Sequence, residues 1–304
     1  MIFSNDKVND IFKKLSNSVV VNVKNLKLSE LITKPITVNL NTSLMKTRES
    51  LLKHKVKRVI VIEKNIPVGV ITEKDIAKKI YGLGTKPIKS VKAKDFKPRK
   101  LFTLTRENSV QECAKLMKKH RISLVIILNK DKTLGGIVTK TNLATVFLTK
   151  GSDLITVSKI MKKDVITAAP SDPILQIESL LIKNAISRII IKRNQKPVGI
   201  ITFRDFVPAK IPRWIAESAD PREVQEYKFK KGLEEIHSNQ MSYLFPFHAT
   251  DIMATKPITI EADKDVKSAI THMIKYNISG LPVVKNKKLV GIITKSDIVN
   301  TLAN

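Results

Sequence analysis

Short apolar runs alternate along this chain with segments whose apolar residues recur every three or four positions. Apolar runs of four or five residues between turn residues are typical of buried strands, and the longer spacing is typical of helices that pack on a sheet. The expected buried strands are Val59–Ile62, Leu124–Leu128, Arg188–Ile191 and Leu281–Val284. The helices expected before them are Ser43–His54, Val110–Lys119, Ile174–Lys183 and Val266–Tyr276.

A turn and a second apolar run follow each buried strand. The predicted turns are Lys64–Asn65, Asn129–Thr133, Arg193–Gln195 and Lys285–Lys287. The predicted second strands are Val68–Ile71, Gly136–Val138, Val198–Ile201 and Val290–Ile293. In the first unit a short strand, Ile36–Val38, opens the series and a helix, Glu73–Tyr81, closes it. The pattern therefore predicts four α/β (α+β) units with the order β-α-β-β-α.

A recurring phrase marks the four units as copies of one another. A Thr ends each second strand, and a residue with an acceptor oxygen follows it three positions later: Thr72 and Asp75, Thr139 and Asn142, Thr202 and Asp205, Thr294 and Asp297. Another Thr lies upstream of each, at Thr37, Thr103, Thr167 and Thr259, at intervals of 35, 36, 35 and 35 residues. Such a constant interval indicates one supersecondary unit repeated four times.

The fourth unit carries a family resemblance most clearly. Asp251–Met253 leads in, Pro257-Ile258-Thr259 follows, and Ile278–Val284 comes before Gly291–Asp297. This pattern resembles the cystathionine-β-synthase (CBS) domain family over about 250 of the 304 residues. The resemblance implies that copies pair into two modules and that the modules stack into a disc, here within one polypeptide. The expected divisions are an extension (1–26), repeats at 27–84, 85–150, 154–206 and 249–304, and a helical, aromatic-rich insertion (207–248).

The Thr-x-x-Asp phrase has two interpretations. Thr at the start of a helix with an acid three residues later is an ordinary capping arrangement. A helix N-terminus at the end of a sheet also favours an anionic phosphate, and the carboxylate can accept both hydroxyls of a ribose. The family resemblance implies the second interpretation: Asp holds ribose, Thr or Ser contacts phosphate, and backbone near the first strand contacts adenine. We therefore expect an adenosine nucleotide of the AMP, ADP or ATP class as ligand, with no obligatory cofactor.

The candidate site residues are those that match the family pattern in each copy, and the copies are unequal. Asn142 replaces the acid in repeat 2, and Lys163-Asp164 replaces Thr-Lys in the lead-in of repeat 3, so we expect one to three occupied sites. Lys119-His120-Arg121 resembles a basic phosphate-binding segment of the regulatory γ subunit of the AMP-activated kinase. His54 and His120 also suit a helix C-terminus, where a cation complements the dipole. The nucleotide-binding candidates are Thr33, Ile36, Lys57, Arg58, Thr72, Asp75, His120, Arg121, Ser123, Thr139, Asn142, Arg188, Thr202, Asp205, Thr255, Ile258, Ser279, Gly280, Thr294 and Asp297.

Charge points to a polyanionic partner. The formal net charge is +28; residues 1–150 hold 32 Lys and Arg against 11 Asp and Glu, and residues 151–304 hold 23 against 16. A field of this sign attracts polyanions. A lysine-rich genome or a hot habitat is the alternative, but hyperthermophile proteins gain Glu as well. The candidate nucleic-acid contacts are Lys86, Lys89, Lys92, Lys94, Lys97, Arg99 and Lys100, which equally suit a solvated surface.

The longer interval between Thr202 and Thr294, 92 residues, contains the insertion. It holds six of the fifteen aromatic residues: Trp214, Tyr227, Phe229, Tyr243, Phe245 and Phe247. A helical arm that packs on the disc is the favoured interpretation, and a stacking platform for unpaired bases is the alternative.

Several functional classes lack support in the sequence. Cys113 is the only cysteine, which excludes an internal disulfide and a cysteine-rich zinc site. We find no catalytic triad, no paired catalytic acids and no metal-ligand spacing, and we expect no enzyme activity. No apolar run approaches the roughly 18 residues of a membrane span, and no secretory signal opens the chain, so a cytoplasmic location is expected.

Two hypotheses follow. In the favoured one, adenosine pockets and the basic surface serve one ligand, an RNA with an exposed terminal adenosine, because an unstacked base and its 2′-OH suit such a pocket. In the alternative, the chain senses free AMP, ADP or ATP and regulates a protein partner without binding nucleic acid. The sequence leaves open a monomeric disc or a homodimer.

Overall fold

The computed structural model describes residues 25–81, 90–96, 100–150, 155–206 and 248–303. The expected β-α-β-β-α order is present, and each unit builds a small sheet. In each sheet the first strand runs parallel to the central strand, and the central and last strands form an antiparallel hairpin. The expected fold class is therefore confirmed.

The strands of the four units correspond one to one. The first strands are β1 (Thr37–Asn39), β4 (Thr103–Leu104), β7 (Thr167–Ala168) and β11 (Ile260–Glu261). The central strands are β2 (Arg58–Glu63), β5 (Leu124–Leu128), β8 (Arg188–Arg193) and β12 (Gly280–Lys285). The last strands are β3 (Ile66–Thr72), β6 (Leu134–Thr139), β9 (Lys196–Thr202) and β13 (Lys288–Thr294), and β10 (Ala254–Thr255) adds to the edge of β9.

Two helices accompany each sheet. Those between the first and central strands are α2 (Leu44–Lys53), α4 (Val110–Lys119), α7 (Ile174–Lys183) and α12 (Val266–Lys275). Those after the last strand are α3 (Glu73–Tyr81), α5 (Lys140–Lys150), α8 (Phe203–Phe206) and α13 (Lys295–Ala303). A single helical turn opens the lead-in of each unit: η2 (Leu28–Glu30), η4 (Ala93–Asp95), α6 (Val157–Ile160) and α11 (Ala249–Ile252).

Local chemistry accounts for the element ends. The Ser43 hydroxyl accepts a hydrogen bond from the Lys46 amide and so caps the start of α2. The β2–β3 hairpin turns through Lys64 and Asn65, which both have positive φ (49° and 64°), as a two-residue hairpin of this twist requires. The second strands extend to Thr72, Thr139, Thr202 and Thr294, one residue beyond the predicted ends.

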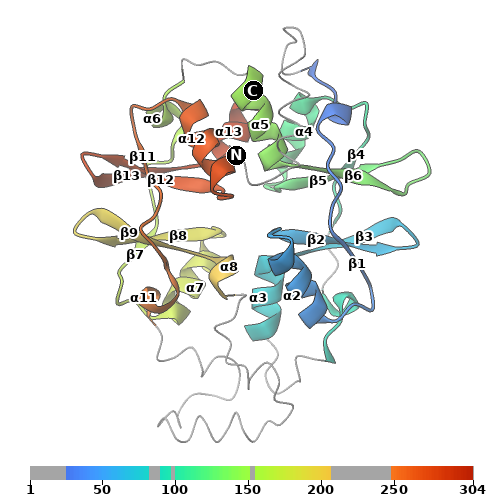
Figure 1. Cartoon of the computed structure of the whole chain (residues 1–304), viewed down its shortest axis with the longest axis horizontal. Helices are drawn as coiled ribbons and strands as arrows, with labels where there is room; N and C mark the ends of the chain where they lie inside the picture. Colours follow the sequence, from blue (N-terminus) through green and yellow to red (C-terminus); the bar gives the residue numbers. More distant parts are fainter. Residues whose placement is uncertain (1–24, 82–89, 97–99, 151–154, 207–247, 304) are drawn as a thin grey trace, which may run out of the picture.

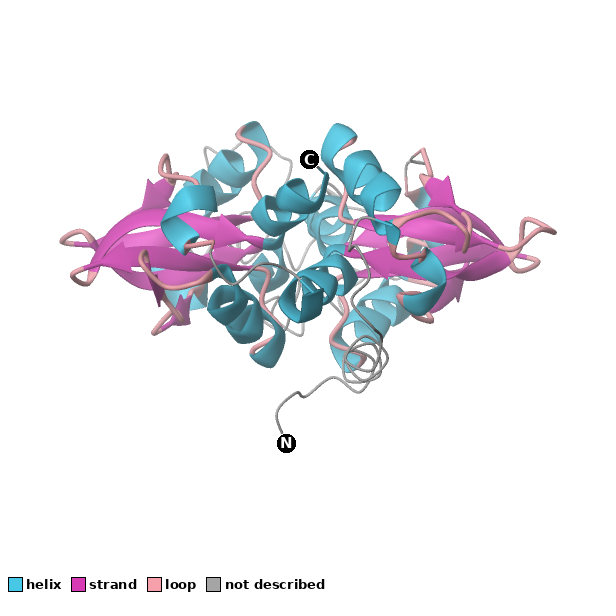
Figure 2. Ribbon diagram, turned by 90° about the horizontal axis from the view of Figure 1, so that it is seen from above, coloured by secondary structure: helices cyan, strands magenta, loops and turns pink. Residues whose placement is uncertain are grey.

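The four sheets form two pairs, with the helices gathered between the pairs. Figure 1 places the sheets of repeats 1 and 2 on one side and those of repeats 3 and 4 on the other, and Figure 2 shows helices filling the centre. Ile60 of β2 packs with Ile126 of β5 in a core cluster between the first two sheets. We call repeats 1 and 2 the first module and repeats 3 and 4 the second module.

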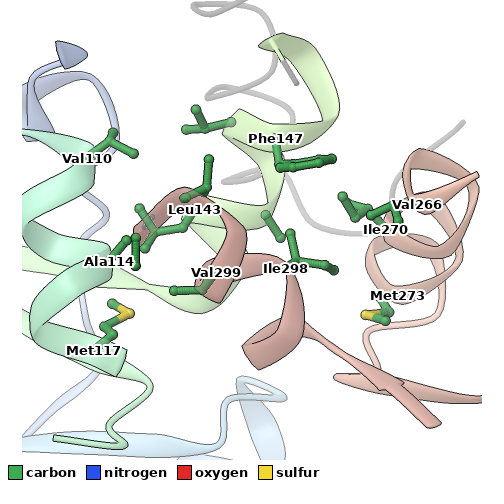
Figure 3. Close-up of a cluster of buried hydrophobic side chains, with 14 of the residues drawn as sticks. Val110, Ala114, Met117, Leu143, Phe147, Val266, Ile270, Met273, Ile298 and Val299 are labelled. Carbon is green, nitrogen blue, oxygen red and sulfur yellow. The ribbon is translucent and has the colours of Figure 1, made fainter. Parts of the chain in front are cut away.

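The helices join the two modules through two apolar cores. One contains helices of repeats 2 and 4, including Met117, Leu143, Ile270 and Val299 (Figure 3). The other contains the corresponding residues of repeats 1 and 3. Each core therefore draws on both modules, and burial of these side chains is the main force that holds the modules together.

The lead-in segments are exchanged within each module. Leu28, in the lead-in of repeat 1, is buried in the core that contains α4 of repeat 2, and Val110 at the start of α4 donates its amide to the Leu26 carbonyl (2.8 Å). The lead-ins of the other three repeats are exchanged in the same way. The backbone amide of Leu44 donates to the Val91 carbonyl, that of Val266 to the Ile155 carbonyl, and that of Ala249 to the Asp172 carbonyl. The core of each repeat is thus completed by the lead-in segment of its sister repeat.

Glycines in the last strands permit this exchange. A Cβ on Gly136 would lie 2.3 Å from the Ile32 side chain, and one on Gly291 would lie 2.7 Å from the Met161 sulfur. A Cβ on Gly199 would lie 2.4 Å from the Met253 sulfur. These glycines leave room for the crossing segment of the sister repeat.

Candidate functional site

The Thr-x-x-Asp phrase forms the same capping arrangement in all four repeats. The Thr72 amide and hydroxyl donate to one oxygen of Asp75 (2.9 and 2.6 Å), and Thr294 does the same to Asp297 (2.8 and 2.6 Å). Thr202 and Asp205 repeat the geometry (2.7 and 2.9 Å). In repeat 2 the amide oxygen of Asn142 replaces the carboxylate and accepts from Thr139 at 2.7 and 2.6 Å. The capping interpretation is therefore correct for this structure, and it holds for Asn as well as Asp.

Strand pairing brings the start of each central strand beside this Thr. Arg58 pairs with Thr72, Leu124 with Thr139, Arg188 with Thr202 and Gly280 with Thr294. Hairpins thus place candidate residues from opposite ends of the motif side by side. The candidates Lys57, Ser123 and Ser279 precede these positions, and each accepts through its carbonyl from the amide after Thr.

A basic residue lies next to the Thr of each repeat, but it comes from one of two positions in the sequence. In repeats 1 and 3 they are Arg58 and Arg188, which open the central strands. In repeats 2 and 4 they are Lys140 and Lys295, which open the helices after the Thr. The sequence prediction named the two arginines and missed the two lysines; their shared place directly after Thr in alternate copies was the available signal.

Ser279 joins three repeats at one hydroxyl. Lys57 of repeat 1 donates to Ser279 Oγ at 2.7 Å, and Arg188 Nη2 of repeat 3 donates to the same oxygen at 2.7 Å. Arg188 Nη1 is buried and has no hydrogen-bond partner. A Cβ on Gly280 would lie 1.9 Å from that nitrogen, so glycine provides the room that the guanidinium occupies.

The two lysines cross between modules in opposite directions. Lys140 Nζ donates to Ser296 Oγ at 2.8 Å, and Lys295 Nζ donates to Thr141 Oγ1 at 3.0 Å. Both acceptors are neutral hydroxyls, and Lys295 is only 6% exposed. Asp297, also 6% exposed, lies one turn into the same helix.

Burial dominates the electrostatics of this junction. Burial, together with the positive charges of Arg188 and Arg58, lowers the pKa of Lys295 to about 7. It lowers the pKa of Lys140 to about 8, where Arg58 adds repulsion and Asp297 opposes it. The pKa values of Arg58 and Arg188 fall to about 10 for the same reason, with Glu73 and Asp297 as their respective opposing carboxylates. The junction is therefore a concentration of positive charge in a desolvated place.

The remaining first-strand candidates lie in the crossing segments. Thr33 pairs with Ile137 of the sister repeat and donates its hydroxyl to the Ile137 carbonyl (3.3 Å). Ala254, rather than Thr255, holds the corresponding place in repeat 4, where it pairs with Ile200. Thr255 is exposed beside Gly199, and Lys256 follows with a positive φ of 51°. Ile36 and Ile258 are partly buried against the apolar cores.

The basic segment after α4 is exposed. His120 is the C-cap residue of α4, as His54 is of α2, in agreement with the helix C-terminal interpretation. Its ring lies 4.2 Å from that of Phe102, and Lys100 Nζ lies 5.8 Å from the Phe102 centroid. Arg121 is exposed with a positive φ of 52°.

Part of the predicted nucleic-acid surface can be located. Lys92, Lys94 and Lys100 are exposed. The other four candidates (Lys86, Lys89, Lys97 and Arg99), the six aromatic residues of the insertion and most of the N-terminal extension lie outside the described residues.

Two further observations concern chemistry and membranes. Within the described residues, no group of three or more His, Cys, Asp or Glu side chains is arranged to hold a metal ion. Burial raises the pKa of the Cys113 thiol to about 12, which disfavours the reactive thiolate. In the part of the chain that is described, no helix combines the length and apolar character needed to cross a bilayer.

Comparison with protein families decides the assignment. The model of the CBS domain matches four times, at residues 23–82, 93–149, 157–211 and 249–304. The chain belongs to the CBS-domain family. Four matched CBS domains agree with the four repeats seen in the sequence and the structure.

Individual relatives cover the chain to different extents. MJ1225 of Methanocaldococcus jannaschii is 24% identical over 89% of this chain and 96% of its own length. Its crystal structure, described as that of a proposed archaeal homologue of γ-AMPK, covers 91% of this chain with a TM-score of 0.76 at 20% identity. MK0525 of Methanopyrus kandleri is 31% identical over 48% of the chain, which spans 61% of that relative. The CBS domain pair of MJ0100, solved with 5′-methylthioadenosine and S-adenosyl-L-methionine, covers 48% of the chain at 29% identity and a TM-score of 0.33.

Proposed function

We propose that this CBS-domain protein is a non-catalytic regulator that binds adenine nucleotides at its repeats, with the phosphates directed toward the junction between modules. The observation that carries the proposal is the adjacency of the Thr–Asp pairs to Arg58 and Arg188 through strand pairing. A ribose at the carboxylate then has its 5′ side beside a helix N-terminus and a cation. Both features favour phosphate.

Regulation requires that the ligand prefer one of two states of the protein. The contact of three repeats at Ser279 offers such a difference, because a phosphate that recruits Lys57 or Arg188 changes a contact between modules. A regulatory role also agrees with the proposal made for MJ1225.

The experiment exploits the natural Asn142. Since its amide caps α5 with the geometry that Asp75 has at α3, Asp75→Asn and Asp297→Asn should preserve folding and change only the acceptor for ribose. Calorimetric titration with adenosine, AMP and ATP should show binding to the native protein and a loss of roughly tenfold in each variant, as expected for a hydrogen bond to a charged group.

Asp95→Asn is the matched control, because Asp95 caps η4 with the same bond (2.7 Å to the Lys92 amide) and is exposed. Its nucleotide affinities should equal those of the native protein. Absence of binding by the native protein would remove the proposal, and unchanged affinity in both repeat variants would show that the acids are caps alone.

A second candidate is binding of RNA with an exposed terminal adenosine, favoured by the net charge of +28 and by exposed Lys92, Lys94 and Lys100. Phe102, with His120 against its ring and Lys100 above it, adds an aromatic contact near these cations. Phosphate contacts of this kind release counterions and depend on salt.

The test is to deproteinise the purified protein and to separate the released nucleotide into monomer and polymer. Oligonucleotides that end in A or C should then be titrated at 50 and 200 mM salt. We expect polymer in the preparation, preference for A, and steep weakening with salt. Mononucleotide alone, together with no RNA binding at 50 mM salt, would leave the free-nucleotide function and exclude this one.

A further inference from the structure

The outer edge of β3 differs from the equivalent edges of the other three repeats. On β6, Ile137 exchanges two backbone hydrogen bonds with Thr33 of the crossing lead-in (3.0 Å each). On β13, Ile292 exchanges two with Lys162 (2.9 Å each), and β9 pairs with β10. The corresponding residue of β3 is Val70, and among the described residues no segment pairs with β3 on its outer side.

The space beside Gly69 is open, whereas the equivalent space is filled in the other repeats. The three glycines equivalent to Gly69 are buried beneath a side chain of the crossing segment, but Gly69 is only half-buried. Phe96 follows its helical turn as Met161 and Met253 follow theirs, yet it packs against the core of repeats 1 and 3, with Lys79 Nζ 5.9 Å from its ring centroid. Within the described part of the chain, a Cβ on Gly69 would meet only the Val61 side chain.

The same strand exposes apolar side chains. Ile66 is 45% exposed and Val68 is 36% exposed, and only two other large apolar side chains are exposed among the described residues. The residues equivalent to Ile66 are polar in the other repeats: Thr133, Lys196 and Lys288. Lysine on an edge strand discourages pairing with another chain, and repeat 1 lacks this protection.

The lead-in of repeat 2 also has a different sequence at the pairing position. In repeats 3 and 4 the pairing residue, Lys162 or Ala254, lies five positions before the first-strand Thr. The same count back from Thr103 gives Pro98, which lies outside the described residues. Proline has no amide hydrogen, so it cannot donate the bond that Lys162 donates to Ile292.

The open edge is preformed at the rim of the molecule (Figure 1). The Leu134 amide donates to the Asn65 carbonyl (2.9 Å), which fixes the tip of the β2–β3 hairpin against β6. A partner strand would therefore find an edge that is already ordered, and the entropic cost of binding is correspondingly lower.

Charge indicates the kind of partner that this edge suits. Lys64 is exposed in the turn before β3, and exposed Lys100 adjoins Leu101, which packs in the same cluster as Val70. Glu63 is the only acid of the hairpin, and residues 1–150 hold 32 Lys and Arg against 11 Asp and Glu. A second copy of the chain would be repelled by this field, whereas an acidic segment would be attracted.

We propose that β3 is a docking edge for a protein partner that adds an extended, acidic segment to the sheet of repeat 1. The backbone of the segment pairs with Val70 as Lys162 pairs with Ile292, and an apolar side chain occupies the space beside Gly69. Ile66 and Val68 supply apolar contact along the strand. The inference is independent of the proposed nucleotide function, because none of these β3 residues is a nucleotide-binding candidate.

The test uses the full-length protein and a labelled synthetic peptide, with binding measured by fluorescence anisotropy at low salt. The peptide carries the sequence of Ile252–Thr255, part of which pairs with β9 within the chain, between two pairs of glutamates. We expect a Kd of about 10–100 μM. The same peptide with Ala254→Pro should bind at least about tenfold more weakly because it lacks the pairing amide. A peptide flanked by lysines should also bind at least about tenfold more weakly.

Variants of the protein locate the site. Gly69→Ala places a methyl group where the apolar side chain of the peptide should lie, and Ile66→Lys introduces the residue type that repeats 3 and 4 carry. Each should weaken the glutamate-flanked peptide by at least about tenfold. Ile182→Lys is the matched control, because Ile182 is an exposed apolar residue (37%) on α7, and its affinity should equal that of the native protein. Thermal unfolding verifies that each variant is folded.

Hydrogen exchange measured by mass spectrometry should show slower exchange in β3 when the peptide is bound. No binding by the native protein at about 1 mM peptide, or native affinity in both Gly69→Ala and Ile66→Lys, would overturn the inference. Equal affinity for the peptides flanked by glutamate and by lysine would overturn the assignment of an acidic partner. A native protein that is dimeric by light scattering and becomes monomeric in Ile66→Lys would show that a second copy occupies the edge, which also contradicts the proposal.

Discussion

At the scale of single residues, Asp75, Asn142, Asp205 and Asp297 show why a motif can be located more readily than interpreted. Their spacing from Thr was evident in the sequence, and all four make the capping bonds. Capping and ribose binding require the same position, so the sequence could not separate them. Lys140 and Lys295 were not predicted as site residues, because the sequence pattern does not distinguish a lysine at an exposed helix start from a lysine that is buried against another module.

Lys295 allows a prediction about stability. Its pKa is about 7 in the folded protein against an ordinary 10.5, so the unfolded chain binds more protons between these values and raising the pH stabilises the fold. The destabilisation that results from burying the charged Lys295 is complete below about pH 7 and disappears toward pH 10.5. Lys295→Met should therefore raise the free energy of unfolding by roughly 1–4 kcal/mol at pH 7, with a difference that shrinks by pH 10.

Denaturant unfolding at both pH values measures this difference. Lys288→Met, which changes an exposed lysine, should alter stability by less than about 0.5 kcal/mol at either pH. A Lys295→Met variant that is less stable than the native protein at pH 7 would show that the charged ammonium is well stabilised as it stands.

At the scale of elements, the strands and helices followed from the hydrophobic pattern because each is set by residues close in sequence. The helices α4 and α7 occupy the predicted residues, and the hairpins turn where Lys64-Asn65 and its counterparts stand. The exchanged lead-ins could not be predicted, since their partners, such as Leu26 and Val110, are far apart in the chain. The sequence pattern therefore treated each repeat as self-contained, and the structure shows that it is not.

The crossing segments predict unequal effects of adding a methyl group to equivalent glycines. A Cβ on Gly291 would lie 2.7 Å from the Met161 sulfur and 2.8 Å from the Lys162 carbonyl, whereas one on Gly69 would meet only Val61 at an ordinary 3.5 Å. Gly291→Ala should therefore lower the free energy of unfolding by about 1–3 kcal/mol. The control variant Gly69→Ala should leave the free energy of unfolding nearly unchanged, and chemical denaturation measures it for both variants. Equal effects of the two substitutions would contradict the prediction and would mean that the crossing segment moves aside without loss of stability.

At the scale of the whole molecule, both modules contribute to each helical core. Leu143 and Phe147 of the first module pack with Ile270 and Val299 of the second (Figure 3). The repeat in the sequence predicted four units, and the family resemblance implied two modules, but neither indicated which repeats would meet across the centre: 1 with 3, and 2 with 4. That choice depends on the complementarity of helix faces, which periodicity alone does not specify.

This shared core predicts the behaviour of half the protein. A fragment of residues 1–150 would expose the apolar faces of α4 and α5, and exposed patches of this kind drive association. The fragment should form a dimer, with a second copy in place of repeats 3 and 4. Light scattering after size-exclusion chromatography measures its mass, and the same fragment with Leu143→Glu should dimerise at least tenfold more weakly. A native-sequence fragment that remains monomeric at 100 μM would contradict the prediction.

The exchange of lead-ins also constrains how such a chain can lengthen or shorten. If one repeat were deleted together with its lead-in segment, the sister repeat would lose the lead-in that covers its core. The sister's own lead-in would then have no core to cover. A viable chain of this type therefore gains or loses units two at a time. Any attempt to trim this protein to a smaller working piece should cut at the boundary between pairs and never within one.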